Sequence, residues 1–112
     1  MKKIIVTGGR DYDDWAMVQE VLNLIKPDLV IQGGASGTDK LALDWCELNK
    51  VLCVTFPADW NSEGRAAGPK RNIRMIVSHP DAVVIAFPGG KGTENCIKEA
   101  VKRNRIVLQV HK

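Results

Sequence analysis

The sequence has little of what several common functions require. Its three cysteines form no CxxC pair and its two histidines lie far apart, so no metal-ligand spacing occurs. Aromatic residues make up only 5% of the chain and the formal net charge is +3, which is weak support for nucleic-acid binding. The N-terminal apolar run, 4–6, is too short for a signal peptide or a membrane span. We therefore expect a cytoplasmic protein with no metal, no cofactor and no membrane partner, whose Cys46, Cys53 and Cys96 are buried free thiols.

Length and composition indicate one domain spanning residues 1–112. An apolar content of 45% and a charged content of 26% are ordinary for a globular protein of this size. Short β-branched or apolar runs at 4–6, 29–31, 51–55, 82–85 and 106–108 alternate with segments of helical periodicity. This alternation predicts an α/β fold with a parallel sheet covered by helices on both faces.

The expected helix starts rest on local capping signals. Asp11, Asp13 and Asp14 are expected in the first turn of the first helix, where acidic side chains favour the dipole. Ser36, followed three residues later by Asp39, resembles a capping box at the second helix. Segment 56–68 is expected to be an irregular functional loop. Pro69 is expected at the first position of the third helix.

The stretch Ala86–Asn95 is the strongest functional signal in the chain. It contains three glycines within four positions, preceded by Pro88, between a predicted strand and a predicted helix. Such a loop lets the backbone approach a ligand, and the helix start offers unpaired N–H groups at the positive end of a dipole. Thr93 is the expected N-cap. This stretch therefore predicts an anion site, although a purely structural turn remains the alternative.

Two other glycine-rich loops follow predicted strands, at 7–11 and 33–39. In a parallel sheet these loops and the long loop 56–68 all open at the carboxyl edge, where ligands bind. A phosphate-bearing ligand explains their common chemistry better than turn geometry does. The usual phosphate motifs are absent: Lys91 is followed by Gly92 rather than Ser or Thr, and no GxGxxG occurs.

At these loops the sequence resembles the SLOG superfamily, which includes the LOG phosphoribohydrolases and the Smf/DprA proteins. The resemblance is strongest to the YspA-like branch and covers residues 4 to 108 or so. It rests on five motifs that follow one another along the chain: Thr7-Gly8-Gly9-Arg10-Asp11, Gly33-Gly34-Ala35-x-Gly37-x-Asp39, Phe56-Pro57-Ala58-Asp59-Trp60, Gly68-Pro69-x-Arg71-Asn72-x-x-Met75 and Pro88-Gly89-Gly90-x-Gly92-Thr93.

This resemblance implies a Rossmann-like three-layer α/β/α domain with strand order 3-2-1-4-5 and about four helices. It also implies a nucleotide or nucleotide-derived ligand and a homodimer or higher homo-oligomer. In LOG enzymes the PGGxGT motif binds the nucleotide phosphate, while an Arg and a Glu act on the N-glycosidic bond. Arg71 matches that Arg, but Asn95 stands at the position of the Glu, with Glu94 one residue away. One residue turns a helical side chain by roughly 100°.

The expected site residues fall into two sets. Those expected to bind ligand or phosphate are Gly8, Gly9, Arg10, Gly34, Ser36, Gly37, Asp59, Trp60, Arg71, Asn72, Met75, Pro88, Gly89, Gly90, Lys91, Gly92 and Thr93. The catalytic candidates are Arg71, Glu94 and Asp39.

Several of these residues have simpler roles open to them. Arg10 suits a phosphate or carboxylate but equally a surface ion pair with Asp11 or Asp14. Trp60 could stack on a base or pack over the sheet edge. Lys91 could bind phosphate or be an exposed lysine of the turn.

Three functions follow. The first is a nucleotide-binding sensor or sequestering module with weak or no catalysis. The second is a nucleotide N-glycosidase using Glu94, Asp39 or Asp59. The third is DprA-like nucleic-acid binding, which the mild charge disfavours.

Overall fold

Five strands form one sheet in which all four neighbouring pairs run parallel. The computed structural model describes residues 1–111. The strands are β1 (Lys3–Thr7), β2 (Leu29–Gln32), β3 (Leu52–Thr55), β4 (Val83–Ala86) and β5 (Val107–Gln109). Their order is β3-β2-β1-β4-β5, so the expected topology is confirmed.

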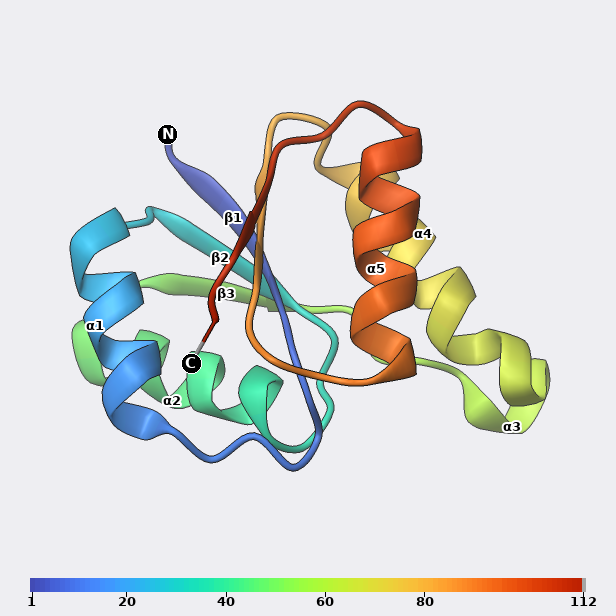
Figure 1. Ribbon diagram of the computed structural model, residues 1–112, viewed down its shortest axis with the longest axis horizontal. Helices are drawn as coiled ribbons and strands as arrows, with labels where there is room; N and C mark the ends of the chain where they lie inside the picture. The colour runs from blue at the N-terminus through green and yellow to red at the C-terminus, as the bar shows by residue number, and fades with distance from the viewer. Residues whose placement is uncertain (112) are drawn as a thin grey trace.

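Four main helices cover the sheet, two on each face (Figure 1). They are α1 (Trp15–Ile25), α2 (Thr38–Asn49), α4 (Ala67–Ser78) and α5 (Lys91–Lys102). Helices α1 and α2 lie on one side and α4 and α5 on the other, which gives the expected α/β/α layering. Among the described residues, no helix has the length and apolarity needed to cross a membrane.

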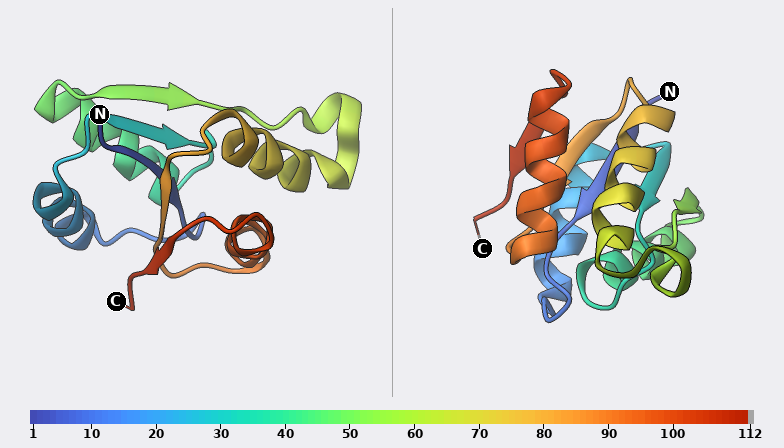
Figure 2. Two further views of the ribbon diagram at one scale, coloured as in Figure 1. Left: turned by 90° about the horizontal axis from the view of Figure 1, so that it is seen from above. Right: turned by 90° about the vertical axis from the view of Figure 1, so that its right-hand side faces the viewer.

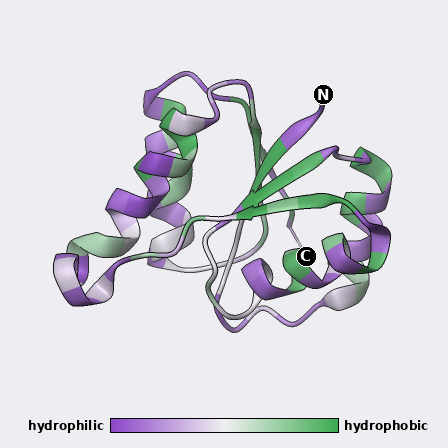
Figure 3. Cartoon of the chain, turned by 180° about the vertical axis from the view of Figure 1, so that it is seen from behind, coloured by the Kyte–Doolittle hydropathy of each residue, from purple (hydrophilic) through white to green (hydrophobic). Residues whose placement is uncertain are grey.

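The core consists of two clusters, one on each face of the sheet. Ile4 and Val6 of β1 pack with residues of α1 and α2, whereas Ile5 packs with residues of α4 and α5. This alternation follows from the two-residue period of a strand. Because β1 is central and covered on both faces, all three side chains are buried, and the strands are the most hydrophobic part of the chain in Figure 3.

The first two helices begin differently from the sequence-based expectation. Asp14 is the N-cap of α1 and accepts a hydrogen bond from the N–H of Met17 at 3.0 Å, so Asp11 and Asp13 precede the helix rather than lying in its first turn. The N-cap of α2 is Gly37, without a side-chain capping bond. The capping-box prediction was wrong because Ser36 instead donates to the carbonyl of Arg10 at 3.2 Å.

Helix α5 also begins at a different residue from the one that the sequence predicts. Gly90 is the N-cap, which makes Thr93 the third helical residue, and its side chain is buried. The prediction of Thr93 as N-cap was therefore wrong. Because the helix begins earlier, the last glycine of the loop, Gly92, belongs to its first turn.

The segment between β3 and α4 is more regular than expected. It holds the short helix α3 (Trp60–Glu63) and the 3-10 turn η1 (Gly64–Ala66), which stand out beyond the end of β3 (Figure 2). Asp59 caps α3 by accepting from the N–H of Ser62 at 3.1 Å. Helix α4 starts at Ala67, so Pro69 is its third residue and not its first. Proline is tolerated at this position because a first-turn N–H has no intrahelical acceptor, so its absence costs no helix hydrogen bond.

We predict that truncating Leu22 destabilises the fold far more than truncating Leu24 on the same helix. Leu22 is 0% exposed and Leu24 is 77% exposed. Leu22→Ala removes buried methyl groups and leaves a cavity, which costs about 2–5 kcal/mol in free energy of unfolding. Leu24→Ala should stay within about 0.5 kcal/mol of wild type. Urea unfolding measures both, and equal losses would contradict the packing of α1 described above.

Candidate functional site

A cavity of about 710 Å³ opens at the carboxyl edge of the sheet. Residues from β1, α2, α3, η1, α4, α5 and the loops between them line it. Of the residues expected to form a site, the following line the cavity: Gly8, Gly9, Arg10, Asp39, Trp60, Arg71, Asn72, Met75, Gly89, Gly90, Lys91, Gly92 and Thr93. Distant segments of the chain thus meet at one edge.

The N-terminus of α5 faces this cavity. The helix begins at Lys91, so the N–H groups of Lys91, Gly92 and Thr93 have no carbonyl partner within the helix. The loop before α5 is held against the loop after β1, because the N–H of Gly9 donates to the carbonyl of Pro88 at 2.9 Å. The result is a glycine-lined wall that carries the positive end of a helix dipole.

The first N–H of α2, in contrast, is hydrogen-bonded to another part of the chain. The carbonyl of Gly9 accepts from the backbone N–H of Thr38 at 3.1 Å and from its hydroxyl at 3.2 Å. Gly37 permits this approach, since its φ is +73° and a Cβ there would lie 2.3 Å from the same carbonyl. Consequently Gly34, Ser36 and Gly37 do not line the cavity, although their neighbour Ala35 does.

Arg71 is a buried cation in the lining of the cavity, with only 8% of its surface exposed. Its Nη1 donates to the carbonyl of Gly33 at 2.5 Å and its Nε to Oδ1 of Asn72 at 3.0 Å. A Cβ at Gly33 would lie 2.2 Å from Nη1, so only glycine allows this contact. Burial lowers the pKa of Arg71, and the negative charge of Asp39 raises it. A guanidinium remains charged in spite of this burial.

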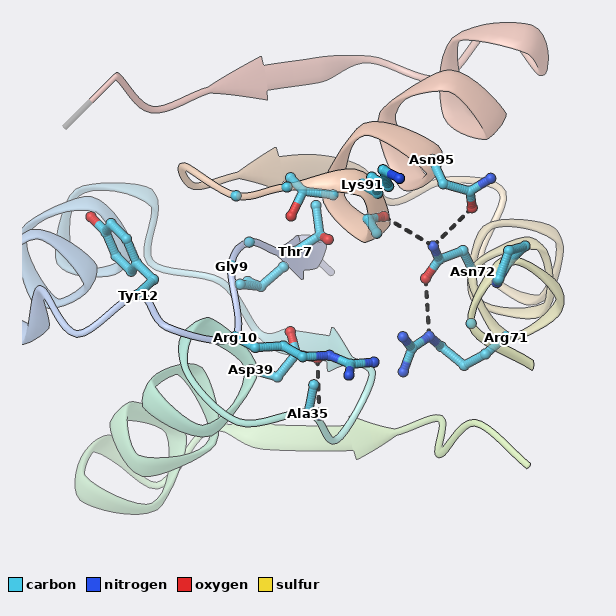
Figure 4. A pocket seen from close by; sticks show the side chains of 18 of the residues that line it. Thr7, Gly9, Arg10, Tyr12, Ala35, Asp39, Arg71, Asn72, Lys91 and Asn95 are labelled. Atoms are coloured by element: carbon cyan, nitrogen blue, oxygen red, sulfur yellow. Dashed lines mark hydrogen bonds between the residues drawn. The ribbon is translucent and has the colours of Figure 1, made fainter. Parts of the chain in front are cut away.

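Asn72 connects Arg71 to the start of α5, as Figure 4 shows. Its Nδ2 donates to Oδ1 of Asn95 at 3.0 Å and to the carbonyl of Gly92 at 3.3 Å. Both ends of the Asn72 amide are therefore engaged. Asn95 lines the cavity, whereas the neighbouring Glu94 is exposed and is not among the lining residues.

Arg10 and Trp60 are two lining residues that contact each other. The guanidinium carbon of Arg10 lies 5.2 Å from the centre of the Trp60 ring, a cation–π distance, and Trp60 is 49% exposed. Within residues 1–111 Arg10 forms no ion pair, so neither Asp11 nor Asp14 neutralises it. Asp59 lies outside the lining and serves as the cap of α3.

Asp39 is a carboxylate in a largely cationic site. It is 7% exposed and accepts a hydrogen bond from the N–H of Ala35 at 3.2 Å. Burial raises its pKa, while the Ala35 hydrogen bond and the charges of Arg71 and Arg10 act in the opposite direction. Met75, buried at 2% exposure one turn beyond Arg71, forms an apolar part of the lining.

The lining carries more positive than negative charge. The lining contains four cationic side chains, Arg10, Arg65, Arg71 and Lys91, and two acidic ones, Asp11 and Asp39. Sequence reasoning missed Arg65, which the turn η1 brings to the cavity, as well as Val6, Thr7, Asp11, Tyr12, Ala35, Gly68, Pro69 and Asn95. Arg65 could have been proposed from the sequence, because it is a cationic residue in the long loop that was expected to be functional. The described residues contain no cluster of three or more potential metal ligands.

The parallel sheet, its strand order and the helices on both faces define a Rossmann-like protein, and sequence comparison identifies the family. The chain belongs to the YspA, cpYpsA-related SLOG family, whose sequence profile matches residues 2–62. It is also 35% identical over 120 aligned positions to the Gene 61 protein of Mycobacterium phage D29, an alignment that covers 96% of this chain and 95% of that protein. The expected resemblance to the YspA-like branch is thus confirmed.

We predict that ionisation of Asp39 destabilises the native protein as pH rises. Its folded pKa lies above that of an unfolded Asp, about 3.9, so the native state retains the proton to higher pH. Stability from this group is complete below the unfolded pKa and is lost as pH rises through the folded pKa. The free energy of unfolding of wild type relative to Asp39→Asn should therefore fall over that range.

Asp81→Asn is the matched control for this measurement. Its hydrogen bond with Lys3 lowers the pKa of Asp81, so the corresponding difference should rise with pH instead of falling. Denaturant unfolding at a series of pH values gives both differences. A flat or rising difference for Asp39 would contradict the assignment.

Proposed function

We propose that the protein binds a nucleotide or nucleotide-derived small molecule in this cavity, as a sensor or sequestering module with weak or no catalysis. The observation that carries the proposal is the open N-terminus of α5 beside a cavity lined by four cationic side chains. Membership of a SLOG family is consistent with a nucleotide-related role.

In this proposal the phosphate lies at the start of α5. Backbone N–H groups of Lys91, Gly92 and Thr93 supply directed donors, and the helix dipole favours the anion. Lys91 and Arg10 add charge from the two sides. The cationic side chains of such a site repel one another, and a bound phosphate would offset that repulsion.

The remainder of the ligand would extend along the cavity. Trp60 presents a half-exposed ring in the cavity lining, which suits a planar base. Asp39 offers carboxylate oxygens that can accept hydrogen bonds from ribose hydroxyl groups. Met75 supplies apolar surface beneath. The volume of about 710 Å³ lies within the range of small-molecule sites.

Two observations favour binding over cleavage. Asn95 cannot ionise, and its Oδ1 is engaged by Asn72. Glu94, the nearest carboxylate in sequence, is exposed and lies outside the lining. Neither residue supplies a carboxylate to the cavity wall formed by α5.

N-glycosidic hydrolysis remains the second candidate because of Asp39. A buried carboxyl group with a raised pKa beside two arginines is the kind of group that enzymes use as an acid or base. If it is used so, incubation with nucleoside monophosphates should release free base, and Asp39→Asn should abolish the release. Binding without release of base supports the sensor instead.

We further propose a cytoplasmic homo-oligomer. The free thiols suit a reducing compartment. Apolar side chains stand exposed near β5, among them Val101 at 58%, Ile106 at 64% and Leu108 at 54% exposure, and these would suit contact with a second copy.

We predict that Lys91→Glu weakens nucleotide binding by about tenfold or more, equivalent to about 1.4 kcal/mol. The substitution reverses a charge beside the proposed phosphate, yet a glutamate at a helix N-terminus favours the dipole, so the fold should be unharmed. Calorimetric titration with adenosine monophosphate and ADP-ribose measures the affinity. Lys98→Glu, exposed on the same helix but outside the cavity lining, is the control and should bind as wild type does.

Equal affinities for both variants and wild type would place the anion elsewhere. No binding of any member of a nucleotide panel to wild type would contradict the proposed function itself. Thermal shift gives an independent readout, because a ligand that binds only the native state raises the melting temperature.

A further inference from the structure

Cys46 and Cys53 form a pair of thiols outside the nucleotide cavity. Cys46 lies in α2 and is 1% exposed, whereas Cys53 lies in the edge strand β3, is partly exposed and packs against the core cluster that contains Cys46. The two thiols are close enough to influence each other: interaction with Cys53 raises the pKa of Cys46, and interaction with Cys46 lowers the pKa of Cys53. The chain between them turns tightly, with the N–H of Val51 donating to the carbonyl of Cys46 at 2.9 Å.

The surroundings of Cys53 favour its thiolate. The Nε2 of Gln32 donates to the Cys53 sulfur at 3.7 Å and to the hydroxyl of Thr55 at 2.6 Å. The Oε1 of Gln32 accepts from the N–H of Gly34 at 2.6 Å, which fixes the orientation of the amide. Interaction with the Cys46 thiol is the largest of the influences that lower the pKa of Cys53 to about 7. The thiolate is the reactive form of cysteine, so Cys53 is the more reactive member.

We propose that Cys46 and Cys53 are a redox modification site that closes to an intramolecular disulfide in the presence of a peroxide. Cys53 is the attacking residue and Cys46 the resolving one. Cys96 stands apart: it is 0% exposed, and burial raises its pKa to about 11. The inference is independent of the proposed function.

The reaction balances with hydrogen peroxide as the oxidant. The Cys53 thiolate attacks one peroxide oxygen, so an S–O bond forms, the O–O bond breaks, and the departing hydroxide takes a proton to become water. Cys46 then attacks the Cys53 sulfur. The S–S bond forms, the S–O bond breaks, and the second hydroxide leaves as water with the Cys46 proton. The two sulfurs lose two electrons and peroxide gains them.

Peptide mapping of the folded wild-type protein tests this directly. After peroxide treatment and alkylation of the remaining thiols, the intact mass should show the loss of two hydrogens and one alkylated thiol. Trypsin cuts after Lys50, so the disulfide should join peptides 41–50 and 51–65, while Cys96 appears alkylated in peptide 92–98. Dithiothreitol should restore three alkylatable thiols.

Single substitutions separate the roles. Cys96→Ala should form the same cross-link. Cys46→Ser should stop at a Cys53 sulfenic acid that dimedone traps, and Cys53→Ser should give neither product. The proposal is overturned if folded wild type shows no 41–50/51–65 cross-link while its thiols are consumed, or if the cross-link forms only in denaturant. Cross-links that involve Cys96 or a second chain would equally overturn it.

Discussion

The buried guanidinium of Arg71 is the interaction on which the site depends. It joins α4 to the loop after β2 through the carbonyl of Gly33, and Asn72 extends the connection to α5. Without it the Gly33 carbonyl would lose its partner, which costs about 1–3 kcal/mol for a buried polar group. A cation held this rigidly at the carboxyl edge requires negative charge nearby. Asp39 supplies part of that charge, and a bound anion would supply more.

The two glycine loops that follow β2 and β4 share a composition but differ in what they offer a ligand. The carbonyl of Gly9 accepts from the N–H and the hydroxyl of Thr38, so the first N–H of α2 is satisfied within the protein. The start of α5 has no such partner within the helix and faces the cavity. One loop thus braces the site while the other is open to an anion. The bracing also sets the position of Arg10, whose carbonyl accepts from Ser36.

Much of the fold was predictable from local pattern, because apolar runs such as Ile4–Val6 identify buried strands and their alternation with helices dictates parallel pairing. Helix starts were less predictable. The Asp14 side chain caps α1, whereas α2 and α5 begin after Gly37 and Gly90, which have no side chain to cap them. The glycines after β1 and β4 and Arg71 were identifiable as candidate lining, whereas Gly34 and Gly37 after β2 do not line the cavity. The contact of Gly9 with Thr38 and that of Asn72 with Asn95 were not, since each joins residues distant in sequence.

The central claim is that the start of α5 binds the phosphate of a nucleotide. Amide NMR spectra recorded during titration with adenosine monophosphate and ADP-ribose test it at single-residue resolution. The account predicts that the largest saturable shifts fall on the N–H groups of Gly90, Lys91, Gly92 and Thr93, and that those of Thr38 and Asp39 at the start of α2 move less. Shifts confined to α2 or to the outer face of the sheet, or no saturable shift at all, would contradict it.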